Sequence, residues 1–179
     1  VKGESANSPF GFTFRQVCLT FAFIGLTLSL AQGILVRRLA GKMHEGVMAG
    51  IGAALDIVGF ILVVAAISAQ TVVGLFAAMG MVVVGFAMMM PSLNSLISRR
   101  SDPARQGGIL GAAQSINSLA RILGPMIGVP LVERNSSLPY WTAAGMMCLG
   151  LLMVVVAARG GRDFLPESIA LESLPVDFV

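Results

Sequence analysis

Five long apolar runs, separated by short polar segments, make up most of this chain. Each run has about the 20 residues that an α-helix needs to cross the hydrocarbon core of a bilayer. Only Ser-Ala-Gln-Thr separates the second run from the third, which indicates a tight helical hairpin rather than one very long helix. The pattern predicts five transmembrane helices, at residues 16–36, 47–68, 71–93, 107–132 and 139–158.

The segments that flank these runs differ in character. Residues 1–15 are mixed in polarity, and we expect an external loop or helix end there. Residues 16–162 hold the expected five-helix bundle. Residues 163–179 carry acidic residues and prolines, a composition typical of a disordered, solvated tail. The chain begins at Val1 without a methionine, which suggests a fragment of a longer protein.

Composition favours lipid over water as the main solvent of this chain. Hydrophobic residues make up 56% of it and charged residues 12%, and the mean hydropathy is +0.86. A soluble domain has about 45–50% apolar and about 25% charged residues. The fold class that we expect is therefore an all-α integral membrane bundle.

The residues needed for common catalytic and metal chemistry are scarce. Cys18 and Cys148 lie in apolar runs and are interpreted as small buried hydrophobes, and His44, the only histidine, lies in a short basic loop. No Ser-His-Asp arrangement and no Walker-type Gly-Lys-Ser/Thr can be assembled from the sequence. We therefore expect no enzyme activity, no metal site and no cofactor.

The basic residues predict an orientation in the membrane. Those that gather on one side of the predicted spans are Arg37, Arg38, Lys42, Arg99, Arg100, Arg105, Arg159 and Arg162. The opposite side has Lys2, Arg15 and Arg134. Basic residues accumulate in cytoplasmic loops, so the first side is predicted to be cytoplasmic, with the N-terminus outside and the C-terminus inside. This bias accounts for the net charge of +3 without a nucleic-acid partner.

Two charged residues lie inside predicted spans. Asp56 is near the middle of the second span, and Arg121 is in the outer half of the fourth. An ionised residue at the bilayer centre costs at least about 2.5–3.5 kcal/mol on insertion scales. Counted from the predicted cytoplasmic ends of their spans at 1.5 Å per residue, Asp56 and Arg121 lie about 15 and 21 Å deep. These depths allow a structural ion pair between them. The alternative for both residues is a direct role in handling the substrate or protons.

Other polar and small residues follow the helical period within the spans. In the fourth span they step by three and four residues, and they are Gln114, Asn117, Arg121, Gly124 and Gly128. Such a stripe faces protein or a watery cavity rather than lipid. Gln32 in the first span and Asn94 at the inner end of the third add polar side chains that line or brace a path. The glycines are interpreted mainly as packing surfaces, and Gly124 with Pro125 as the site of a helix kink.

Four stretches, at residues 30–42, 55–60, 91–119 and 123–128, together resemble the C-terminal half of a major facilitator superfamily transporter, within the drug/proton antiporters and their tetracycline-exporter branch. Leu30–Lys42, "LAQGILVRRLAGK", resembles the end of the eighth helix and the basic loop motif that follows it. Gly33, Leu35 and Arg38 match that motif, whereas Arg37 stands where the motif has Asp. The resemblance therefore does not carry over the acidic role of that position.

The other three stretches lie further along the chain. "LDIVGF" resembles the ninth-helix pattern of tetracycline exporters, whose acid, implicated in transport, falls on Asp56. Pro91–Leu119 resembles the tenth helix, its basic loop and the start of the eleventh helix. "LGPMIG", Leu123–Gly128, resembles the Gly-Pro signature of antiporters. The resemblance, over about residues 9–162, implies helices eight to twelve of a transporter that binds substrate between two six-helix halves.

This resemblance implies a secondary active transporter, with proton-coupled efflux of drugs or similar amphipathic molecules by alternating access. Uptake of a sugar or another metabolite is an alternative within transport, and a non-transporting membrane subunit or anchor is an alternative outside it. The expected partners are the lipid bilayer, a small-molecule substrate, protons and the missing N-terminal half-bundle. The protein is expected to cross a bacterial inner membrane several times.

Overall fold

The computed structural model describes residues 10–160, which form an all-helical bundle without a β-strand in that range. Five helical segments in it are long and apolar enough to cross a membrane, as the sequence predicts. The expectations for residues 1–9 and for the acidic tail, residues 163–179, fall outside the described residues. The elements in chain order are α1 (Phe14–Leu30), η1 (Ala31–Val36), α2 (Arg37–Leu39), α3 (Glu45–Ser68), α4 (Val72–Arg100), α5 (Gln106–Arg134) and α6 (Leu138–Gly160).

The first span is longer than predicted and contains a change of helix type. It runs from Phe14 to Leu39, and η1, near its C-terminal end, is a π-helix. A π-turn cannot be predicted from hydrophobic periodicity, because it shifts the backbone hydrogen bonds by one residue without changing the polarity of the side chains. The loop to α3 therefore begins only after Leu39.

The third span differs more from its prediction, because α4 continues to Arg100 instead of ending near residue 93. Pro91 lies inside this helix and does not end it. Its last two turns are mostly polar, and a polar segment next to a span is typical of a loop. The structure keeps them helical and places Arg99 and Arg100 in the final turn, where side chains contact two other helices.

The hairpin between α3 and α4 is as tight as the sequence indicates. Thr71 donates its backbone N–H to Ala66 O at 3.1 Å, which closes the turn. Gln70 takes a left-handed conformation, with φ of 52°, and its side-chain amide donates to Ile67 O at 3.0 Å. This local hydrogen bond helps a non-glycine residue to hold that conformation.

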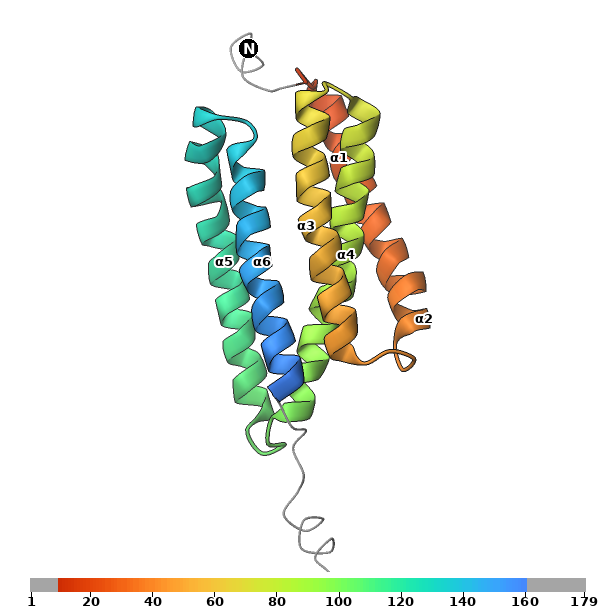
Figure 1. Ribbon diagram of the computed structural model, residues 1–179, viewed down its shortest axis with the longest axis vertical. Coiled ribbons are helices and arrows are strands. Elements are labelled where there is room, and N and C mark those ends of the chain that lie inside the picture. Colours follow the sequence, from red (N-terminus) through yellow and green to blue (C-terminus); the bar gives the residue numbers. More distant parts are fainter. Residues whose placement is uncertain (1–9, 161–179) are drawn as a thin grey trace, which may run out of the picture.

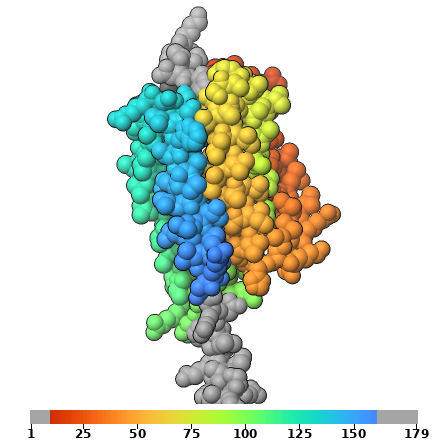
Figure 2. Space-filling model, viewed as in Figure 1, coloured from red at the N-terminus to blue at the C-terminus, as the bar shows by residue number. Residues whose placement is uncertain are grey.

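Helix α3 is the centre of the packing. It contacts α4 along its length and also contacts α6, whereas α1 packs against α4 (Figure 1). Helix α5 touches α4 and α6 at few positions and has no buried residue. Figure 2 shows α6 running beside α3 along one face of the molecule. The buried core thus lies between α3 and α4, and α5 is left largely uncovered.

The two cysteines contradict their predicted burial. Cys18 and Cys148 are free thiols, and both are exposed on the described part of the chain. A membrane-spanning helix turns one side outwards toward lipid or further protein, so an apolar neighbourhood in sequence does not place a residue between helices.

Connections alternate between the two ends of the bundle. The loops after α2 and α4 and the end of α6 lie at one end, and the turns after α3 and α5 lie at the other (Figure 1). The basic residues grouped by sequence, from Arg37 to Arg159, therefore gather at a single end of the described bundle. This is the charge asymmetry that a positive-inside orientation requires.

Candidate functional site

Small residues let α3 and α4 approach closely. A Cβ atom added to Gly52 would lie 2.7 Å from Gly85 O, and one added to Gly59 would lie 2.5 Å from Val82 Cγ2. A Cβ atom on Gly85 would collide with Asp56 Oδ1 and with the carbonyl of Gly52. The interpretation of the α3 glycines as packing surfaces is confirmed for Gly52 and Gly59.

Asp56 lies inside this helix contact rather than on a cavity wall. Its relative exposure is 1%, and its Oδ1 atom has no hydrogen-bond partner. The ion pair that residues 10–160 show joins Glu45 to Arg99, so Asp56 and Arg121 do not pair there. Since α5 contacts α4 and α6 rather than α3, Arg121 is held away from the α3–α4 contact. Burial of an ionised carboxylate without a partner is costly, so the charged form of Asp56 is unfavourable in this contact.

The polar residues predicted to line or brace a path sit on uncovered helix faces. Gln32 on η1, Asn94 on α4, and Gln114 and Arg121 on α5 are exposed, and Asn117 on α5 is half-buried. Within residues 10–160 their side chains make no hydrogen bond. Polar side chains at membrane depth need protein or water against them, so these faces require a covering that the described chain does not supply.

The glycines of α5 differ from those of α3. A Cβ atom on Gly124 or Gly128 would meet nothing within 4 Å. Both glycines line a cavity of about 410 Å³ between α5 and α6, with Pro139 and Thr142 opposite. The close helix contact expected here is therefore absent within the described bundle. Helix α5 continues through Pro125, and the kink at Gly124-Pro125 stays a prediction.

Of the motif residues, Gly33 and Leu35 lie within the predicted first span, whereas Arg38 is predicted in the loop after it, and the structure corrects the placement of Arg38 to a helix. Gly33 and Leu35 lie in the π-helix η1, next to Gln32, and Arg38 lies in α2. π-Turns inside α-helices occur frequently at functional sites. The polar end of the first span is thus a helical surface.

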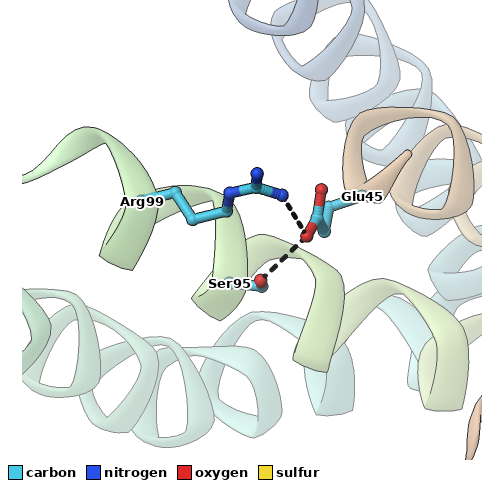
Figure 3. A network of polar contacts seen from close by, with 3 residues as sticks. All are labelled: Glu45, Ser95 and Arg99. Carbon is cyan, nitrogen blue, oxygen red and sulfur yellow. Dashed lines mark hydrogen bonds and ion pairs between the residues drawn. The ribbon is translucent and has the colours of Figure 1, made fainter. Parts of the chain in front are cut away.

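A polar network at the basic end of the bundle was missed by the sequence analysis. Arg99 donates from Nη1 to Glu45 Oε1 at 2.7 Å, and the Ser95 hydroxyl donates to the same oxygen at 3.4 Å (Figure 3). Two signals were available. Ser95 and Arg99 are four residues apart on one helix face, and Glu45 stands in the first turn of α3, where the helix dipole favours an acid.

Arg100 makes a second link, from α4 to α6. Its Nη1 donates to Ala157 O at 2.6 Å and its Nη2 to Ala158 O at 3.4 Å. These carbonyls belong to the last turns of α6, where backbone acceptors lack helical partners and cations are favoured. The two adjacent arginines therefore tie α4 to two different helices.

A bundle of five membrane-length helices with polar positions on their faces indicates a polytopic membrane protein. The family model of the Major Facilitator Superfamily matches residues 6–125 of the chain. The chain belongs to this superfamily of membrane transporters. No solved structure gives a significant match.

The chain is also similar to mammalian proteins of this superfamily, each named Major facilitator superfamily domain-containing protein 10. The mouse protein (Mus musculus) is 29% identical over 146 residues, 80% of this chain and 29% of the relative. The human protein (Homo sapiens) is 29% identical over 146 residues, with 79% and 29% covered. The protein from cattle (Bos taurus) is 27% identical over 144 residues, with 79% and 28% covered.

Two points follow from these relatives. The chain spans only about 29% of the length of the curated relatives it matches. The relatives are mammalian, so they lend no support to the expected bacterial inner membrane.

Proposed function

We propose that the full-length protein is a secondary active transporter that exports drugs or similar amphipathic molecules in exchange for protons, by alternating access. In this proposal the chain supplies helices eight to twelve, which belong to the C-terminal half-bundle. The missing helices cover the exposed faces of η1, α4 and α5 and close a central path against them.

The observation that carries the proposal is the set of uncovered polar faces. Gln32, Asn94, Gln114 and Arg121 are exposed on three different elements, at positions inside or next to membrane spans. Exposure to lipid at the bilayer centre would cost about 2.5–3.5 kcal/mol for the charged residue alone. A water-filled path between two halves removes that cost. It also places polar groups where a substrate can contact them.

Asp56 is the candidate for proton coupling. Its carboxyl group is buried between α3 and α4, and Oδ1 lacks a hydrogen-bond partner. A bound proton removes the cost of an unpaired buried charge. Release of that proton then requires water to reach the α3–α4 contact, which couples protonation to a helix movement.

The test uses the full-length protein in proteoliposomes with an imposed proton gradient. Efflux of a fluorescent amphipathic dye is expected to stop when an uncoupler dissipates the gradient. Asp56→Asn keeps the volume but cannot exchange the proton, so it is expected to lose gradient-driven efflux while it keeps dye binding. Efflux that survives the uncoupler would remove proton coupling from the proposal.

Transport of an organic anion is a second candidate, and Arg121 favours it. This side chain is exposed on α5, and no described carboxylate neutralises it. Arg121→Ala is expected to abolish transport of anionic substrates only. Gln114→Ala, on the same helix face, is expected to keep the preference for anionic over neutral substrates. Equal loss of neutral and anionic substrates in Arg121→Ala would argue against an anion site.

A further inference from the structure

A groove of about 530 Å³ lies between α3, α4 and α6 at the basic end of the bundle. Aliphatic side chains line most of it, among them Val47 and Ile51 of α3, Leu96 of α4, and Leu151 and Val155 of α6. Val47 and Ile51 are 54% and 39% exposed, so the groove is open on the described surface. It is an apolar slot that the helices of this chain do not fill.

One end of this slot is cationic. His44, Arg100 and Arg159, from the ends of three helices, line the same groove. No Asp or Glu lines it. The neighbouring acid, Glu45, is already bound to Arg99. Two arginine side chains therefore line one space that no described carboxylate lines, which makes the site complementary to an anion.

The donors of Arg100 are only partly used. The guanidinium has five N–H donors, and two described hydrogen bonds go to Ala157 O and Ala158 O. Its Nε atom is buried and has no hydrogen-bond partner. The guanidinium therefore keeps N–H donors that no described acceptor uses.

A second cavity continues the apolar surface on the other side of Arg100. It has a volume of about 450 Å³, shares Leu96 and Arg100 with the groove, and is lined by Ile97 of α4 and Met153 of α6. Arg100 thus stands between two apolar slots that both lead into the membrane-spanning part of the helices.

We propose that this groove binds an anionic phospholipid, with its phosphate at Arg100 and Arg159 and an acyl chain along Val47, Ile51 and Leu151. Basic pockets between membrane helices on the cytoplasmic side are suited to anionic lipid headgroups, and the basic residues of this chain gather at that end. A free anion would use the arginines but would leave the aliphatic slot empty. A phospholipid matches both halves of the site.

The test is native mass spectrometry of the full-length protein in detergent with palmitoyl-oleoyl phosphatidylglycerol or phosphatidylcholine, which share their acyl chains. Phosphatidylglycerol is expected to bind more tightly. Arg159→Gln, whose side chain makes no hydrogen bond in the described range, is expected to weaken that binding about five-fold, the effect of one basic residue near a membrane surface.

Two further variants separate charge from shape. Arg105→Gln removes the same charge from the same end of the bundle but outside the groove, and it is expected to leave lipid binding unchanged. Ala54→Phe fills the slot without changing charge, and it is expected to weaken phosphatidylglycerol binding as well.

Three results would overturn the proposal. One is equal binding of the two lipids, which would remove the headgroup contact. Another is an equal loss in Arg105→Gln and Arg159→Gln, which would indicate a diffuse surface charge. The third is full displacement of the lipid by millimolar inorganic phosphate, which would identify a free-anion site instead.

Discussion

At the scale of single residues, Gly85 and Asp56 form the most constrained contact in the described bundle. The carboxyl group of Asp56 occupies the space that a side chain at position 85 would need. The carbonyl oxygen of Gly52 also lies only 2.6 Å from the same added Cβ atom. Backbone atoms cannot move aside as a flexible side chain can. The presence of an acid in this contact therefore depends on a glycine opposite.

Gly85→Ala is expected to destabilise the protein by about 1–3 kcal/mol, the usual cost of overpacking a tight core. Gly80→Ala is the matched control in the same helix, because its Cβ atom would lie at an ordinary 3.6 Å from Phe23 Cζ. Thermal unfolding in detergent measures both. Asp56→Ala combined with Gly85→Ala should recover part of the loss, since the two residues share the contact. Equal melting temperatures for the two glycine variants would contradict the close contact.

At the scale of elements, α5 differs from its neighbours. It has no buried residue, and its polar stripe is exposed or half-buried, whereas α3 buries its corresponding stripe against α4. Both stripes have the same helical spacing in sequence. The same pattern therefore serves close packing in one helix and an uncovered face in the other.

Cysteine accessibility in the full-length protein distinguishes the two faces of α5. With Cys18 and Cys148 replaced by alanine, Gln114→Cys is expected to react with a water-soluble maleimide, because its face borders the proposed path. Ile116→Cys, about 200° away around the helix at 3.6 residues per turn, is expected to react only with a lipid-soluble reagent. The ratio of labelling rates measures the difference, and equal rates at both positions would argue against a wet stripe.

At the scale of the whole molecule, charge and topology agree. The connections alternate between two ends, and the basic residues gather at one of them. The ion pair of Arg99 and the hydrogen bonds of Arg100 join α4 to α3 and α6 at that same end. The basic end thus combines an orientation signal with a structural role.

Reporter fusions in the full-length protein test the orientation. A fusion after Gly160 is expected to be active as a cytoplasmic reporter, and insertions at Gln70 or Asn135 are expected to be active only with an extracytoplasmic reporter. Replacing Arg37, Arg38 and Lys42 with glutamine should weaken this preference, because basic residues in short loops set orientation. An extracytoplasmic signal after Gly160 would reverse the assignment.

The order of amino acids alone is enough to predict the five spans, the alternation of their connections and the positions of Asp56 and Arg121 within them. These features depend on polarity and period along one chain, which the bilayer's thickness and low polarity translate directly into helices. It also identified the α3 glycines as a packing surface, because small residues at helical spacing favour close approach. It could not fix the length of α4, since polar last turns are indistinguishable from a loop without their partners.

Which side chains meet became known only from the three-dimensional packing of the helices. It placed Asp56 against Gly85 instead of Arg121, brought Glu45 to Arg99 across 54 positions in the chain, and directed Arg100 to the end of α6. Such contacts depend on which helices are neighbours and how each is rotated, and both are set by the packing of all helices together. Hydrophobic periodicity gives each helix a face, but the partner of that face is a property of the assembled bundle.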